Sequence, residues 1–129
     1  NRGIENDLVP FAQQNDLGII VYSPMERGLL TGKYFAEGKL KENDHRNGYF
    51  QQFDLEKVKN FLNAIMPIAT EKGATLSQLV LRWTSLQPAI SIVLAGSRNA
   101  DQAAANAKAI DINISTDEMN FINSELAKI

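Results

Sequence analysis

The chain has 129 residues, with 13 basic and 15 acidic side chains and a net charge of −2. This balance argues against a nucleic-acid-binding domain, which carries a clear basic excess, and no apolar run reaches the roughly 18–20 residues of a membrane span. The absence of cysteine excludes a disulfide framework and a thiolate metal site. We therefore expect a globular, cytoplasmic protein without nucleic-acid or membrane partners. The sequence opens at Asn1 without an initiator Met, so we expect a piece of something longer.

The first part of the chain predicts a helix and then a strand. Apolar residues recur at helical spacing from Ile4 to Gln14, with Asn6 as the expected N-cap. Ile19–Tyr22 is apolar without alternation, which is typical of a strand buried on both faces of a parallel sheet. Residues 34–53 are polar and show no period, with few large apolar residues to anchor them. Because such long loops are usually lids or disordered, we expect a mobile loop here.

The middle of the chain predicts two consecutive helices. Asp54 is the expected N-cap of the first, and Gly73 suits the left-handed residue that closes it. Pro67 lies inside this helix and is expected to kink it. Thr75 and Gln78 form a capping box, which indicates where the second helix begins.

The last part predicts a second strand and two further helices. Ile90–Leu94 is again mostly apolar, Asn99 is the expected cap of a helix that runs to Lys108, and Ser115–Glu118 is another capping box. Two buried strands alternating with about five helices predict an α/β fold with right-handed parallel units. Two strands are too few for a self-sufficient sheet, so we expect something else to cover their edges.

Two turns of small residues follow the predicted strands. Gly96–Asn99 leads directly into a helix, whose free N–H groups and dipole suit a phosphate, and Arg98 adds a permanent cation. Residues 23–33 offer similar groups. Because ligands gather at the carboxyl ends of parallel strands, the two turns predict a site for a diphosphate-containing cofactor. The alternative is that both turns are ordinary solvated connections.

Three stretches of the chain resemble the aldo-keto reductases. Tyr22–Lys33 is similar to the loop after the family's seventh strand, Leu79–Trp83 to the helix before its eighth strand, and Gly96–Gln102 with Asn106 to its adenosine-phosphate signature. The resemblance runs in order along essentially the whole chain and is closest to the branch related to potassium-channel β subunits. It implies that residues 1–129 are the C-terminal, cofactor-binding portion of a (β/α)8 TIM barrel. Such a barrel usually needs about 250 residues, so about half is missing.

The resemblance also implies NADP(H) as the cofactor and assigns a role to each site residue. Tyr22 occupies the position that stacks on the nicotinamide ring. The residues implied to contact the pyrophosphate side are Ser23, Pro24, Met25, Gly28 and the cation Lys33. The residues implied to hold the adenosine end are Gly96, Ser97, Arg98, Gln102 and Asn106. Ala105 departs from the family, because many members carry a Glu there.

The resemblance implies that the parent protein is an NADPH-dependent oxidoreductase that reduces aldehydes or ketones, its small carbonyl substrates, to alcohols. No residue here matches the family's catalytic Tyr, Lys, Asp and His, so we expect the chain alone to be inactive. His45 is the single histidine, which makes a protein-built transition-metal site improbable. Two alternatives stay open: a cofactor-sensing or regulatory subunit, and an inert fragment. We expect the chain to associate with the missing N-terminal half or with itself.

Overall fold

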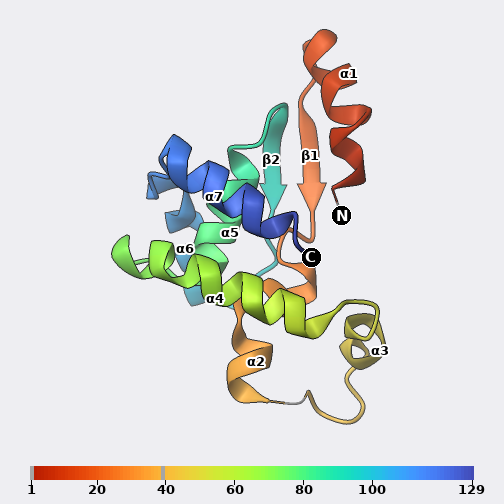
Figure 1. Ribbon diagram of the computed structural model, residues 1–129, viewed down its shortest axis with the longest axis vertical. Coiled ribbons are helices and arrows are strands. Elements are labelled where there is room, and N and C mark those ends of the chain that lie inside the picture. Colours follow the sequence, from red (N-terminus) through yellow and green to blue (C-terminus); the bar gives the residue numbers. More distant parts are fainter. Residues whose placement is uncertain (1, 39) are drawn as a thin grey trace.

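Two parallel strands form the centre of the computed structural model, which describes residues 2–38 and 40–129. Strand β1 (Ile19–Tyr22) pairs with β2 (Ile90–Leu94), and both have the bounds that the sequence predicts. The register places Tyr22 opposite Leu94, with an irregularity at the start of β1. Both strands point the same way in Figure 1, so the loops that follow them leave from the same edge of the pair. The predicted α/β class with parallel strands is confirmed.

Helices make up most of the rest of the described chain. The α-helices are α1 (Leu8–Gln14), α2 (Lys33–Glu37), α3 (Arg46–Phe50), α4 (Leu55–Glu71), α5 (Leu76–Ser85), α6 (Ala100–Ala107) and α7 (Thr116–Leu126). The 3₁₀ helices are η1 (Gly3–Glu5), η2 (Glu26–Thr31) and η3 (Lys108–Asp111). In Figure 1, α1 lies beside β1, α5 to α7 lie on the side of β2, and α2 and α3 lie beyond the ends toward which both strands point. Within the described residues this gives seven α-helices rather than about five, because residues 34–53 contribute to two of them.

Side-chain caps start the long helices where the sequence predicts them. The carboxylate of Asp54 accepts the backbone N–H of Lys57 at 3.1 Å and begins α4. The capping box of α5 is complete, because Thr75 accepts the N–H of Gln78 and the Gln78 amide oxygen accepts the N–H of Thr75. The Gln78 amide nitrogen also donates to the carbonyl of Ala105 at 2.8 Å. This side chain therefore joins the start of α5 to the end of α6.

The start of the chain differs from the prediction. The first residues form the separate turn η1, in which the N–H of Asn6 donates to the carbonyl of Gly3. Asn6 consequently has helical backbone angles, which do not suit an N-cap. Asp7 caps α1 instead.

The fourth α-helix contains the proline that is expected to kink it. Pro67 lies inside α4, which continues through this residue as one helix.

Residues 34–53 are anchored more firmly than their composition predicts. They include most of α2 and all of α3, and Phe50 is only 2% exposed within the core cluster that also contains Leu29 and Ile65. The partly buried side chains of this segment that pack against the same cluster are Tyr34, Phe35, Leu40, Tyr49 and Phe53. The expectation of few apolar anchors is therefore wrong, because aromatic residues from two short helices reach one core. Mobility of the segment stays a prediction, and Lys39 lies outside the described residues.

One face of the strand pair remains exposed. Ile20, Tyr22, Ile92 and Leu94 share this face through the register, and their exposed fractions range from 49% to 81%. The expected burial on both faces is therefore wrong for the described residues, which cover the opposite face only. The strands carry apolar residues on both faces, but the described chain covers only one of them. The other face is therefore suited to contact with further polypeptide.

Candidate functional site

A cleft of about 950 Å³ opens at the edge where both strands end. Its walls come from the turn after β1, the loop after β2, one residue of α5, two residues of α6 and parts of residues 33–50. The predicted cofactor residues that line it are Ser23, Pro24, Met25, Gly28, Lys33, Gly96, Ser97, Arg98, Gln102 and Asn106. The remaining one, Tyr22, lines an adjoining depression of about 600 Å³ that shares Ser23 and Gly96 with the cleft. The fold thus brings all the predicted residues to one edge of the strand pair.

The turn after β1 has an unusual backbone. Ser23, Glu26 and Arg27 have φ values of 52°, 46° and 54°, in the left-handed region that L-residues rarely adopt. Gly28 follows with φ 96°, which glycine adopts without strain. Each strained residue costs on the order of 1–3 kcal/mol and persists only where its surroundings hold it, which is typical of functional loops. The Thr31 hydroxyl helps to hold this turn by donating to the carbonyl of Gly28 at 2.7 Å.

Tyr49 of α3 packs against the same turn. The guanidinium carbon of Arg27 lies 3.9 Å from the centre of the Tyr49 ring, a cation–π contact. The Tyr49 hydroxyl donates a 2.9 Å hydrogen bond to Oε2 of Glu26. This hydrogen bond raises the pKa of Tyr49, because the carboxylate favours the protonated phenol.

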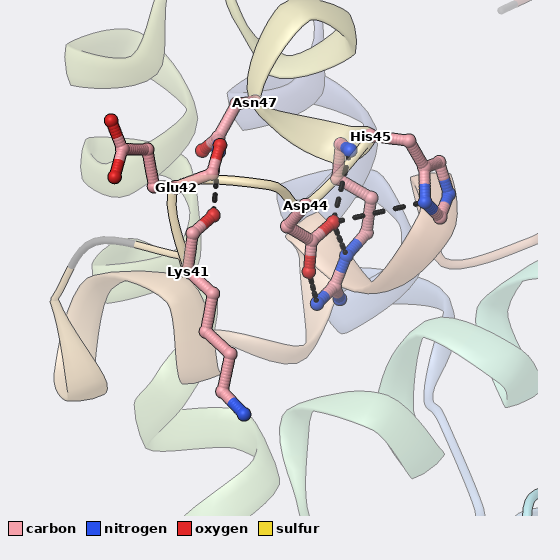
Figure 2. Close-up of polar contacts among 6 residues, drawn as sticks. Lys41, Glu42, Asp44, His45 and Asn47 are labelled. Carbon is pink, nitrogen blue, oxygen red and sulfur yellow. Dashed lines mark hydrogen bonds and ion pairs between the residues drawn. The ribbon is translucent and has the colours of Figure 1, made fainter.

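An arginine–carboxylate pair lies at the cleft beside α3. Arg46 donates from Nε and Nη2 to the two carboxylate oxygens of Asp44, at 2.9 and 2.7 Å (Figure 2). These hydrogen bonds hold the pKa of Asp44 well below its usual range. A side chain at Gly28 would begin 3.7 Å from Nη1 of Arg46, so the guanidinium lies against the strained turn. Figure 2 shows the Lys41 side chain directed away from this pair, and His45 is 80% exposed beside it.

The loop after β2 is shaped by two of the predicted residues. The Gln102 side chain accepts the backbone N–H of Arg98 at 2.9 Å. The Asn106 amide nitrogen donates to the Ser97 hydroxyl at 3.1 Å and to the carbonyl of Gly96 at 3.5 Å. Gln102 and Asn106 therefore hold the loop in position in front of α6. The Arg98 side chain forms no ion pair with the residues that the structure describes, which leaves its guanidinium available to a ligand.

The cleft is strongly cationic. Among its described lining residues the cations are Arg27, Lys33, Lys41, Arg46 and Arg98, and the single carboxylate is that of Asp44. A concave surface with this imbalance concentrates anions such as phosphate groups.

Several lining residues were not named as cofactor-binding by sequence reasoning. Apart from Arg46, which the sequence predicts to close over a pyrophosphate together with Lys33, they are Arg27, Thr31, Tyr34, Gly38, Leu40, Lys41, Asp44, Phe50 and Ser77. Two of these could have been found, because Arg27 and Thr31 lie inside the recognised stretch Tyr22–Lys33. The others come mainly from residues 38–50, whose spacing carries no pattern. In the described part of the chain, no group of three or more His, Cys, Asp or Glu side chains is placed to hold a metal ion. None of its helices has the length and apolarity to cross a membrane.

Comparison with known sequences identifies the family. The sequence model described as "Aldo/keto reductase family" matches residues 1–126. The chain belongs to the aldo/keto reductase family. The resemblance found in its motifs is thereby confirmed, and it extends over nearly every residue.

Curated relatives of this aldo/keto reductase chain include both enzymes and channel subunits. A protein of Oryza sativa subsp. japonica named "Probable voltage-gated potassium channel subunit beta" is 31% identical over 84% of this chain and 34% of its own length. The "NADH-specific methylglyoxal reductase" of Escherichia coli strain K12 is 31% identical over 89% of this chain and 35% of its own length. The chain therefore spans about a third of the length of these relatives.

A solved structure from the same family shares the fold. The glycerol dehydrogenase of Gluconobacter oxydans superposes with a TM-score of 0.85 and 26% identity, over 98% of this chain and 39% of that one. The superposition covers a portion of the larger enzyme, which agrees with the predicted portion of a (β/α)8 TIM barrel. The aldo/keto reductase fold thus accounts for the two parallel strands and their helices.

Proposed function

We propose that this chain is the cofactor-binding part of an oxidoreductase that reduces small aldehydes or ketones to alcohols with NADP(H). The observation that carries this proposal is the cationic cleft at the carboxyl ends of β1 and β2, with five cations and one carboxylate among its described lining residues. The family and the oxidoreductases among its relatives support an enzyme of this class. Hydride transfer is the chemistry that the nicotinamide supplies when the cofactor is bound.

The residues of the cleft fit a dinucleotide phosphate. The turn around Gly28 offers backbone groups and a close approach without a side chain, which suits a pyrophosphate. Lys33 and Arg46 provide charge on the same side, and the N–H groups of Arg46 that are not bonded to Asp44 remain free to donate. In this assignment Ser23, Pro24 and Met25 complete the wall.

The other end of the cleft fits an adenosine phosphate. The positive end of the α6 dipole attracts an anion, and the adjacent Arg98 guanidinium can bind a 2′-phosphate in a bidentate manner. Gln102 and Asn106 fix the loop that carries Arg98, through the hydrogen bonds described above. We therefore propose a preference for NADPH over NADH. The Escherichia coli relative is named as NADH-specific, so this preference is a property to be measured for this chain.

The nicotinamide is proposed to lie at Tyr22. This side chain is 81% exposed and lies at the end of β1, next to Ser23 and the start of the cleft. An exposed aromatic face at that position offers a flat surface on which a ring can stack.

We propose that the chain alone does not catalyse the reduction. No residue in it matches the family's catalytic Tyr, Lys, Asp and His, and His45 is an exposed side chain beside an ion pair. The proton donor must then come from polypeptide that completes the barrel. We propose a cytoplasmic protein with a small carbonyl substrate, in which the exposed strand face contacts a complementary half or a second copy.

A second candidate function is a cofactor-sensing regulatory subunit. It is favoured by the relatives from rice, Arabidopsis thaliana and Schizosaccharomyces pombe that are named as potassium channel β subunits. Both functions use the same cleft. A Tyr, Lys, Asp and His set in the polypeptide that completes the barrel would favour the enzyme.

Titration of the 129-residue chain with NADPH and NADH, followed by calorimetry or cofactor fluorescence, tests the proposed function. Saturable binding of NADPH, tighter than that of NADH, is expected. Lys59→Ala is a suitable control, because it removes an exposed cation that does not line the cleft. If neither cofactor binds, or if Lys59→Ala weakens binding as much as substitution of a cleft cation, the assignment of the cleft is wrong.

A further inference from the structure

Tyr49 connects two parts of the cleft wall that are distant in the sequence. Its ring lies under the Arg27 guanidinium at 3.9 Å, and its hydroxyl donates to Oε2 of Glu26 at 2.9 Å. Its other neighbours hold it firmly, because the ring packs against Phe53 with centroids 5.4 Å apart and the residue contacts the core. One anchored side chain of α3 therefore contacts two consecutive residues of the turn after β1.

The two residues that Tyr49 contacts are two of the three strained residues of the turn. Glu26 and Arg27 both have left-handed φ angles, and Gly28 follows in the same region. Backbone hydrogen bonds from the N–H groups of Glu26 and Gly28 close the turn at 3.0 and 2.9 Å. These bonds fix the path of the chain but leave the Arg27 side chain free to rotate. The contact with Tyr49 defines its direction.

The chemistry of the two contacts keeps Arg27 available to an anion. A guanidinium stacked on an aromatic face retains N–H groups at its edges that can donate to phosphate. The carboxylate of the adjacent Glu26 accepts a hydrogen bond from the Tyr49 hydroxyl, which directs it to Tyr49. Within the residues that the structure describes, Arg27 forms no ion pair.

We infer that Tyr49 is a positioning residue: it holds the Glu26–Arg27 turn in its left-handed form and directs the Arg27 guanidinium along the cleft wall toward an anionic ligand. The inference rests on the proposed function, because the ligand is the phosphate-bearing cofactor. It assigns to α3 a part in cofactor affinity, although Tyr49 itself need not touch the cofactor.

Three variants of the 129-residue chain test this inference. Tyr49→Leu removes both contacts, Tyr49→Phe keeps the ring under Arg27, and Phe53→Leu removes a neighbouring aromatic residue that does not line the cleft. The two readouts are the NADPH dissociation constant and, without cofactor, hydrogen exchange of the Glu26 and Gly28 amides. Tyr49→Leu is expected to weaken NADPH binding by about three- to tenfold, the range of a cation–π contact, and to speed exchange. Tyr49→Phe keeps the cation–π contact but loses the bond to Glu26, so both readouts should lie between those of Tyr49→Leu and the wild type. Phe53→Leu removes only packing against the ring, so it should lower stability but change both readouts less than Tyr49→Leu does.

The exchange readout separates failure of this inference from failure of the proposed function. If the wild-type chain binds neither NADPH nor NADH, the proposed function fails, whereas exchange still shows whether Tyr49 holds the turn. Equal effects of Tyr49→Leu and Phe53→Leu, or unchanged exchange at Glu26 and Gly28, would overturn the inference. If Tyr49→Leu does not fold, Arg27→Gln replaces it, because Arg27 is exposed. Exchange must then speed up at the same amides, and unchanged exchange again overturns the inference.

Discussion

Tyr22 and Leu94 form the last pair of the parallel ladder, so the two loops that follow them begin side by side. This relationship places the turn around Gly28 and the loop that carries Arg98 in the wall of one cleft. Because each loop alone offers only part of the proposed phosphate site, the pairing of the strands is what joins the two parts in one cleft. The register of two short strands therefore determines the geometry of the proposed cofactor site.

Arg98→Ala is expected to weaken NADPH binding by about one to two decades and to leave NADH binding almost unchanged. The reason is that a charge-assisted hydrogen bond contributes roughly 1.5–3 kcal/mol, and NADH lacks the 2′-phosphate that Arg98 is proposed to bind. Parallel titrations of the variant, of the wild-type chain and of Lys59→Ala measure the effect. Equal losses for the two cofactors would place Arg98 elsewhere than at the 2′-phosphate.

Residues 40–45 are expected to be mobile without cofactor and to become ordered when it binds. The sequence predicts mobility for all of residues 34–53. We limit this prediction to residues 40–45, because Phe50 is buried and Tyr34 and Tyr49 pack against the core. Hydrogen exchange with and without NADPH measures the change. Protection should increase at residues 40–45, where Lys41 of the cleft wall is proposed to meet the phosphates, while Phe50–Phe53 should change little. Strong protection of residues 40–45 before any cofactor is added would contradict this prediction.

Asp44→Asn is expected to lower the thermal midpoint at pH 7, and this difference should shrink as the pH falls below about 4. The hydrogen bonds from Arg46 depress the pKa of Asp44 in the folded state, whereas the unfolded value is about 3.9. A depressed folded pKa adds stability above the unfolded pKa, and this stability is lost as the pH falls through the folded pKa. Thermal unfolding at several pH values measures the trend, with the exposed Asp16→Asn as the control. A difference that is independent of pH would mean that Asp44 acts through packing rather than charge.

The chain is expected to sediment as a species larger than 14.3 kDa and to show no NADPH-dependent aldehyde reduction. Its exposed strand face carries Ile20 and Ile92 as register partners, 58% and 49% exposed. Replacing both by Ser removes apolar area that association would bury, at roughly 25 cal/mol per Å², and should shift the chain toward monomer. Sedimentation velocity and a reductase assay test the two parts. A wild-type monomer with ordinary turnover would contradict both.

Much of the secondary structure is predictable from short stretches of sequence, because helix caps and strand preferences depend on residues that are close together in the chain. Thr75 and Ser115 begin helices where their capping boxes lie, since a cap needs only a side chain and an N–H three residues away. The strands are predicted from short, mostly apolar runs rich in β-branched residues. Asn6 is not the cap because its backbone N–H closes the adjacent turn η1, which gives Asn6 helical angles. Asn6 and Asp7 are both suitable cap residues, and the sequence alone does not show which of them caps the helix.

The site was predictable where residues form a contiguous motif, and not where the fold brings distant ones together. Gly28 and Arg98 belong to recognisable stretches, and both line the cleft. Lys41 and Asp44 lie in a segment without periodicity, so nothing in the sequence linked them to the strands. The stacking of Arg27 on Tyr49 depends on how α3 packs on the core through Phe50, which is a property of tertiary structure.

The amide of Gln78 restricts which residues can replace it, because its oxygen and its nitrogen bond to different helices. Its oxygen completes the cap of α5, while its nitrogen bonds to Ala105 near the end of α6. Glutamate would preserve the cap, as it does in other capping boxes, but it would lose the donor and set a negative charge against a carbonyl oxygen. The two helices therefore do not vary independently. A substitution chosen to improve the start of α5 also alters the support of α6, which contributes Gln102 and Asn106 to the cleft.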